Sequence, residues 1–223
     1  FYKKRRYSMT RLIIVRHGES EGNAKNEFQG QYNSDLTDRG HLQAECTAGY
    51  LDSFNIDAIY SSDIRRAMST AAHVAERRGI QVTPDAGLRE IYAGVWERMR
   101  FDDIAAQYPD AYRAWRGDIG SCRCPGGESV AELCRRIKAA LDRIASENEG
   151  KSVLVTTHAT PIRAMRCVWL GLPLSQMQNI PWVPNASVTV TDYCDDGGYR
   201  IVMYGEAGHL IEAGLLTCLS KKI

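Results

Sequence analysis

Short, mainly apolar runs alternate along the chain with longer segments of helical periodicity. The short runs cover residues 12–15, 57–61, 81–83 and 153–157, and they are typical of strands that are buried on both faces. The segments between them repeat apolar residues at the spacing of a helix. This alternation predicts an α/β fold with a mainly parallel sheet and helices on both faces.

Three of the predicted helices have clear start or stop signals. Thr37 is suited to cap a helix that runs to about residue 52. A second helix over 63–78 would stop at Gly79. Ser129 and Glu132 form a capping box that opens a third helix. The first helix would have one face made of Leu42, Cys46, Gly49 and Tyr50. The inner face of the third would consist of Val130, Leu133, Cys134, Ile137, Leu141 and Ile144.

Two segments depart from this alternation. Residues 95–125 are rich in Tyr, Trp, Arg and Asp, and they predict a small helical cap insertion that covers a site. The aromatic residues between 92 and 115 would either line a substrate pocket or pack in the interior. Residues 187–193 and 199–204 flank an Asp-Asp-Gly-Gly turn and predict a C-terminal β-hairpin.

The first ten residues are polar and basic, and they lack periodicity. We therefore expect a flexible leader over 1–10 and a single domain over 11–223, since one domain of this length is common. The alternative is a polybasic tail that touches anionic lipid or RNA. Such tails usually need an anchor or an amphipathic helix, and neither is apparent here.

Amino-acid composition and net charge argue against several classes of binding partner. Lys and Arg number 28 against 27 for Asp and Glu, which gives a net charge of +1 and no basic signature of nucleic-acid binding. The apolar runs are far shorter than the roughly 20 residues that span a membrane. Seven scattered cysteines indicate a reducing compartment. We expect a cytoplasmic protein that binds neither nucleic acid nor membrane. The oligomeric state is left open, and a homodimer is compatible with the sequence.

Charged and imidazole side chains follow four of the predicted strands at the point where each strand ends. The segments are residues 16–19 (RHGE), 61–66 (SSDIRR), 89–90 (RE) and 156–158 (TTH). Ligands of open α/β sheets bind outside the carboxyl ends of the strands. We therefore expect two histidines, several arginines and one glutamate to converge at one edge of the sheet.

This combination suits phosphoryl transfer, which proteins catalyse mostly by positioning and electrostatic stabilisation. Arginine matches phosphate geometry, an imidazole can form a covalent intermediate, and a glutamate can move the required protons. Gly18 beside His17 would let the backbone approach a ligand closely. Each residue alone has an ordinary structural explanation, as a hydrogen-bonded histidine or an ion-paired arginine. The combination at four strand ends favours the catalytic interpretation.

Other motifs carry less information. Cys122 and Cys124 lack the second ligand pair of a zinc site, so we interpret them as surface thiols. The sequence contains neither Gly-x-Gly-x-x-Gly nor a phosphate loop that ends in Gly-Lys-Ser/Thr, which argues against a dinucleotide enzyme or a nucleotide kinase. His41, His73 and His209 stand in helix or tail contexts, and we expect them to be structural.

Six groups of residues occur in a distinctive order: 12–20 (LIIVRHGES), 28–30 (FQG) with 36–40 (LTDRG), 61–67 (SSDIRRA), 88–97 (LREIYAGVWE), 125–129 (PGGES) and 155–158 (VTTH). In this order they resemble the histidine phosphatase superfamily, the phosphoglycerate mutase-like proteins. The resemblance runs from about residue 11 to 210. The RHG tripeptide alone would be weak, whereas the ordered set is specific.

The resemblance implies a role for each matching residue. His17 would be the nucleophile that forms a phosphohistidine, and Glu90 would be the proton donor. The phosphoryl oxygens would be held by Arg16, Arg66, His158 and Asn23. Arg65 does not fit the family position. No metal or other cofactor is implied, because cationic side chains supply the charge that Mg²⁺ supplies in other phosphoryl-transfer enzymes.

Two positions depart from the pattern that the family usually shows. The family commonly has Gly-Gly after its second histidine, whereas Ala159 and Thr160 follow His158 here. An anion contact at the Ala159 N–H survives if the backbone torsions suit a residue with a side chain. Arg98 stands after Trp96 and Glu97 where glycine is common, which affects only the local turn.

The superfamily contains phosphatases and mutases. Mutases resemble one another in a His-Gly-Asn-Ser-like stretch and a longer insertion, whereas this chain has residues 158–161 (HATP) and a short insertion. We therefore favour a phosphomonoesterase that acts on a small phosphorylated metabolite, with a phosphoglycerate mutase as the alternative. A non-catalytic phosphate-binding module is a third reading, although His17 and Glu90 are both present. The insertion and its flanks carry arginines that either recognise a second acidic group or are surface charge: Arg98, Arg100, Arg113, Arg116 and Arg123.

Overall fold

A computed structural model of the chain describes residues 9–194 and 196–216. The strands are β1 (Thr10–Arg16), β2 (Ala58–Ser61), β3 (Val82–Pro84), β4 (Ser152–Thr157), β5 (Val188–Tyr193) and β6 (Tyr199–Glu206). The α-helices are α1 (Glu21–Ala24), α2 (Asp38–Tyr50), α3 (Arg65–Arg78), α4 (Phe101–Gln107), α5 (Pro109–Gly117), α6 (Val130–Glu147), α7 (Ala159–Trp169) and α8 (Gly208–Glu212).

These strands form one sheet in the order β3-β2-β4-β1-β5-β6. β1, β2, β3 and β4 pair in parallel, whereas β5 runs antiparallel to β1 and pairs with β6 as the expected hairpin. The prediction of a mainly parallel sheet with a C-terminal hairpin is confirmed. Asp195, in the hairpin turn, lies outside the described residues.

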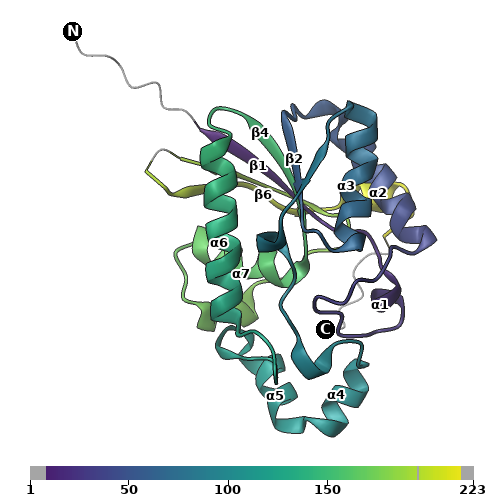
Figure 1. Cartoon of the computed structure of the whole chain (residues 1–223), viewed down its shortest axis with the longest axis vertical. Helices are drawn as coiled ribbons and strands as arrows, with labels where there is room; N and C mark the ends of the chain where they lie inside the picture. The colour runs from purple at the N-terminus through teal and green to yellow at the C-terminus, as the bar shows by residue number, and fades with distance from the viewer. Residues whose placement is uncertain (1–8, 195, 217–223) are drawn as a thin grey trace.

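Helices cover both faces of the sheet, as the apolar runs predict (Figure 1). Alternate residues of β1 point to opposite faces, so Leu12 and Ile14 pack with α6 and α7. Ile13 and Val15 pack instead with α2 and α3. Because both faces are buried, all four side chains of this run are apolar and at most 2% exposed.

Most start and stop signals are where the sequence predicts them. The Thr37 hydroxyl accepts a hydrogen bond from Gly40 N at the start of α2, and the Ser129–Glu132 capping box opens α6. Gly79 ends α3 in the left-handed conformation, with φ +66°. β1 begins at Thr10, so the predicted leader loses its last residue to the sheet, and residues 1–8 lie outside the described part.

The face of α2 that the sequence pattern singled out is not the face that packs inward. Leu42 is 58% exposed, and Cys46, Gly49 and Tyr50 are only partly buried. The face that packs inward consists of Gly40, Gln43, Ala44, Thr47 and Ala48. These residues are small or polar because the start of α2 approaches the loop after β1 closely and Gln43 binds the backbone of that loop through Glu19 N at 2.8 Å.

The segment after β3 forms a small cap at one end of the molecule, where α4 and α5 lie away from the sheet (Figure 1). Trp96 and Trp115 pack edge-on against each other, with ring centroids 6.0 Å apart, in a core of its own. Cys122 and Cys124 belong to this core and are buried, so the prediction of surface thiols is wrong. The cap needs these small apolar groups beneath its aromatic side chains. Within the described residues, no helix is both long and apolar enough to cross a bilayer.

Candidate active site

The four predicted strand ends converge on one cavity of about 790 Å³. Arg16 and His17 follow β1, Arg66 lies in the first turn of α3 after β2, and Glu90 follows β3; all of them line the cavity together with Asn23. His158, at the end of β4, lies directly behind His17, with ring centroids 5.2 Å apart. The structure therefore brings together all six residues that the sequence singles out.

One hydrogen bond fixes the protonation of His17. Its Nδ1 lies 2.6 Å from the carbonyl oxygen of Gly18. A carbonyl can only accept, so Nδ1 carries the proton and Nε2 presents a lone pair. Burial, followed by the charges of Arg66 and Arg16, holds the pKa of His17 well below its usual value. The imidazole is therefore neutral at neutral pH, and its Nε2 accepts a hydrogen bond from Arg66 Nε at 3.3 Å.

The side chain of Arg66 is buried, with 1% of its surface exposed, and hydrogen bonds hold its guanidinium in place. Its Nη1 donates to Tyr32 O and its Nη2 to Gly30 O, both at 2.7 Å. Arg16 is held in a similar way, because its Nη1 donates to Val183 O at 2.6 Å. Burial lowers the pKa of each arginine to about 10, so both remain cationic at neutral pH. Two fixed positive charges beside Nε2 suit a phosphoryl group.

Two polar atoms behind these contacts have no protein partner. His158 Nε2 pairs with the Ser62 hydroxyl at 2.8 Å, while its Nδ1 is buried and unpaired within the described part of the chain. The same holds for Arg16 Nε. Burial, with the nearby charge of Arg66, lowers the pKa of His158 well below its usual value. The Ser62 hydroxyl already accepts from Ile64 N at 3.3 Å, so its hydrogen is available to donate to His158 Nε2, and Nδ1 then carries the ring proton. Unpaired buried donors are costly in a folded protein, so Nδ1–H and Arg16 Nε–H are candidates to contact a bound anion.

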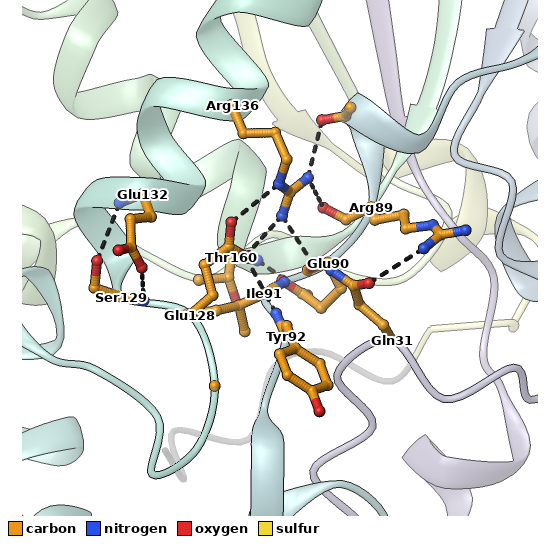
Figure 2. Close-up of polar contacts among 12 residues, drawn as sticks. Gln31, Arg89, Glu90, Ile91, Tyr92, Glu128, Ser129, Glu132, Arg136 and Thr160 are labelled. Atoms are coloured by element: carbon orange, nitrogen blue, oxygen red, sulfur yellow. Dashed lines mark hydrogen bonds and ion pairs between the residues drawn. The ribbon is translucent and has the colours of Figure 1, made fainter.

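Glu90 accepts hydrogen bonds from the backbone at both carboxylate oxygens. Ile91 N donates to Oε1 at 2.8 Å and Thr160 N donates to Oε2 at 3.3 Å, as Figure 2 shows. Burial raises the pKa of this carboxyl group, and it outweighs the opposing effects of these N–H groups and of the Arg66 charge. A carboxyl group with a raised pKa holds a proton closer to neutral pH and is suited to act as a general acid.

Arg136 of α6 clamps the backbone that carries Glu90 (Figure 2). Its Nη1 donates to Gly87 O and Arg89 O, both at 3.0 Å, and its Nη2 donates to Glu90 O at 3.1 Å. Glu128 completes the clamp through a 2.8 Å ion pair with Arg136 Nη2 and accepts from Tyr92 N at 3.2 Å. Glu128 could be noticed in the sequence because it belongs to the motif PGGES, residues 125–129. Its ion pair with Arg136 could not be predicted, because no sequence pattern links the two residues.

The family follows from a comparison with known proteins. A model of the histidine phosphatase superfamily (branch 1) matches residues 12–207. The chain belongs to this superfamily. It is 32% identical over 210 residues to phosphoserine phosphatase 1 of Hydrogenobacter thermophilus, covering 94% of each protein. It is also 32% identical over 206 residues to the probable phosphoglycerate mutase GpmB of Yersinia enterocolitica, covering 91% of this chain and 95% of that protein.

The fold agrees with solved structures of this kind. A mycobacterial glucosyl-3-phosphoglycerate phosphatase superposes with a TM-score of 0.81 and 29% identity, covering 89% of this chain and 100% of that one. The predictions of the α/β fold and of a histidine phosphatase are thereby confirmed. The names of these relatives include phosphatases and a mutase, so the reaction and the substrate need a separate argument.

Asn23 is held in one orientation in this histidine phosphatase. Its Oδ1 accepts from Ser20 N and from Asn185 Nδ2, both at 3.1 Å. With the carbonyl oxygen engaged, the amide NH₂ group of Asn23 is the end that remains to donate. Asn185 also donates to His17 O at 3.0 Å. Sequence reasoning missed Asn185, because it lies in an irregular loop before β5 that carries no motif.

Gly18 has a packing role that the sequence pattern did not predict. A Cβ at Gly18 would lie 2.5 Å from Gly40 O, and a Cβ at Gly40 would lie 1.9 Å from Glu19 O. The two glycines therefore let the loop after β1 pack against the start of α2, and the approach of Gly18 to a ligand stays a prediction. Arg65 points elsewhere, as expected, in an exposed ion pair with Asp35 at 2.9 Å.

The two departures from the family pattern have different outcomes. Ala159 begins α7, and its φ is not positive, so its backbone tolerates a side chain. Arg98 has φ +67° and occupies the left-handed region that favours glycine. Its guanidinium lies 4.6 Å from the centroid of the Tyr32 ring, which partly compensates for the backbone conformation.

The remaining weak motifs have structural roles. His41 Nδ1 lies 3.2 Å from His73 Nε2 on the surface, and His209 pairs with the Thr47 hydroxyl at 2.9 Å. Among residues 9–194 and 196–216, no three His, Cys, Asp or Glu side chains are grouped as a metal site.

Proposed function

We propose that this protein is a metal-independent phosphomonoesterase that hydrolyses a small phosphorylated metabolite through a phosphohistidine on His17. The observation that carries this proposal is the 2.6 Å contact between His17 Nδ1 and Gly18 O, because it leaves Nε2 unprotonated beside Arg66. A neutral, oriented imidazole with two arginines at hand is suited to attack phosphorus.

The first half of the reaction forms the phosphoenzyme. His17 Nε2 attacks phosphorus, the phosphorus–oxygen ester bond breaks, and the Glu90 proton passes to the departing oxygen. Arg16 and Arg66 line the cavity beside Nε2 and would stabilise the charge on the phosphoryl oxygens. The unpaired His158 Nδ1 and the Asn23 amide would contribute further contacts.

The second half regenerates the enzyme. Glu90, now a carboxylate, takes a proton from water as the water oxygen attacks phosphorus, and the phosphorus–nitrogen bond to His17 breaks. Inorganic phosphate then leaves, with Nε2 again unprotonated. Positioned acid and base catalysis of this kind contributes about 10²- to 10⁴-fold.

Hydrolysis rather than isomerisation is favoured by the short cap, which comprises α4 and α5. A mutase must shield its phosphoenzyme from water, and such shielding needs a larger cover over the site. The phosphoserine and glucosyl-3-phosphoglycerate phosphatases among the relatives support a small polar metabolite as substrate. We also propose the cytoplasm as its compartment, since the described cysteines are free thiols.

The test is phosphate release from a panel of esters in EDTA, with phosphoglycerate isomerisation followed in parallel. We expect chelator-resistant release that His17→Ala reduces at least about 10³-fold, as removal of a nucleophile does. His41→Ala is the control, because His41 lies on the surface away from the cavity, and it retains activity. Isomerisation without net release would establish a mutase, and clear turnover by His17→Ala would exclude His17 as the nucleophile.

A further inference from the structure

Arg163 is a buried cation that the proposed chemistry does not use. It lies on α7, is 3% exposed and lines the same cavity as His17. Burial lowers the pKa of Arg163 to about 10, so it stays charged at neutral pH. Among the described residues, no carboxylate lies within 4.0 Å of its guanidinium. A buried charge without a counter-charge is unfavourable and calls for a compensating group.

The protein holds this side chain in place with only part of its donor capacity. Arg163 Nε donates to Ile180 O at 2.9 Å and Nη2 donates to Met177 O at 2.7 Å. The guanidinium also stacks on Trp182, 3.9 Å from the ring centroid. A guanidinium has five N–H donors. Those that remain have no acceptor among the residues that the structure describes, while the charge itself is fixed at the cavity wall.

The position of Arg163 on α7 indicates which part of a substrate it would contact, namely the leaving group. Thr160, whose N–H binds Glu90 Oε2, lies one helical turn before Arg163 on the same face. Residues three apart on a helix have Cβ atoms about 5–6 Å apart. Because Glu90 would protonate the leaving oxygen, the part of the substrate beyond that oxygen would extend along the side of the cavity that Thr160 and Arg163 line.

Charge among the other lining residues narrows the position further. Glu27 and Asp102 also line the cavity, from the segment after α1 and from α4 of the cap, and Asp102 pairs with Arg100 at 4.0 Å. These carboxylates disfavour an anion beside them, so an acidic group is favoured beside Arg163. Arg116 lines the cavity as well, whereas Arg113 and Arg123 form ion pairs with Asp110 and Glu132 on the surface.

We propose that Arg163 forms a second anion subsite, which selects phosphomonoesters whose alcohol part carries a carboxylate. A single guanidinium matches one carboxylate, whereas the phosphoryl group has Arg16 and Arg66. The inference rests on the proposed function, since it places the leaving group beside Glu90. It adds a specificity determinant that the phosphoryl chemistry does not require.

The test uses pairs of esters that differ in the carboxylate. O-phosphoserine and O-phosphoethanolamine are one pair, and 3-phosphoglycerate and glycerol 3-phosphate are the other. We expect the wild-type enzyme to prefer the carboxylated ester in kcat/KM. Arg163→Gln should reduce this preference about 10- to 100-fold, the range for a hydrogen bond to a charged group. Arg163→Lys keeps the charge but loses the planar fork and the stacking on Trp182, so it retains more of the preference than Arg163→Gln and less than the wild type.

A matched control lies three residues further along α7. Arg166 stacks on Tyr204 at 3.8 Å and does not line the cavity, so Arg166→Gln leaves the preference unchanged. If the wild type shows no preference, or if Arg163→Gln lowers kcat/KM equally for both members of a pair, the inference is wrong. In the second case Arg163 only anchors the wall formed by residues 177–182.

A binding measurement separates this inference from the proposed function. In the His17→Ala background no turnover is needed, and calorimetry gives the dissociation constants of phosphoserine and phosphoethanolamine. If phosphoserine binds more tightly than phosphoethanolamine and Arg163→Gln removes this difference, the subsite is supported, even if the wild type hydrolyses neither ester. Absence of hydrolysis would then count against the proposed function alone. Equal binding of the two esters would overturn the subsite.

Discussion

Two opposing influences set the protonation of Glu90. Burial favours the neutral acid, whereas the N–H groups of Ile91 and Thr160 and the charge of Arg66 favour the carboxylate. Burial is the larger effect, so the pKa of the carboxyl group is raised. The acid form needed to protonate a leaving oxygen is present below this pKa and disappears as the pH rises through it.

Glu90→Gln therefore has two expected effects. It lowers kcat/KM, which reports formation of the phosphoenzyme, about 10²- to 10⁴-fold for alkyl phosphates but much less for p-nitrophenyl phosphate, whose anion leaves without a proton. It also removes the decrease in kcat/KM for alkyl esters that the wild type shows as the pH rises through the Glu90 pKa. Steady-state kinetics on both esters across pH checks this. Equal losses of kcat/KM on the two esters would mean that Glu90 does not protonate the leaving oxygen.

Arg98 combines an unfavourable backbone conformation with a favourable side-chain contact. Its φ of +67° is disfavoured for a residue with a Cβ, and its guanidinium stacks on Tyr32. Arg98→Gly and Arg98→Ala both lose the stacking and differ only in the Cβ. We expect the glycine variant to be more stable to urea than the alanine variant by about 1 kcal/mol.

The matched pair for this prediction is at Arg113 of α5, an exposed residue in an ordinary helical conformation. There the order reverses, because glycine destabilises a helix by about 1 kcal/mol relative to alanine. If alanine were the more stable choice at both positions, the left-handed conformation of Arg98 would be wrong.

At the scale of elements, α6 acts on the site without reaching the cavity. Arg136 binds three carbonyls of the segment that carries Glu90, and its ion pair with Glu128 is largely shielded from solvent. These contacts hold the backbone of Glu90 in place and so set the position of its carboxyl group in the cavity. A shift of about 1 Å in a catalytic group costs on the order of 10²-fold in rate.

Arg136→Lys should therefore reproduce the selectivity of the Glu90 variant in weaker form. We expect a loss of about 10- to 100-fold on alkyl phosphates and a smaller loss on p-nitrophenyl phosphate. Arg135, the exposed neighbour on α6, provides the control Arg135→Gln, which leaves both rates unchanged. Parallel losses on the two esters would show that the clamp contributes to stability alone.

At the scale of the whole molecule, the sheet, the cap insertion and the gathering of the candidate site residues could be predicted from the sequence, whereas the core of the cap with its buried cysteines could not. Strands such as β1 are buried on both faces, so their residues are uniformly apolar and easily detected. His17, Arg66 and Glu90 follow strand ends, and the topology of a parallel sheet gathers those ends. The inward face of α2 could not be recognised from the spacing of large apolar residues, because close packing at Gly40 selects small residues there.

The same contrast explains why the reaction class is easier to predict than the substrate. The groups proposed for phosphoryl transfer lie at one sheet edge, and their order along the chain is enough to find them. Arg163 and Trp182 are brought together across a wall of the cavity by two carbonyl contacts, Ile180 O and Met177 O, that no local pattern encodes. The proposed specificity would therefore depend on long-range packing between α7 and the loop before β5. A substitution confined to Trp182 would alter the choice of ester, whereas a change at Asn185 of the same loop would also remove a contact of His17.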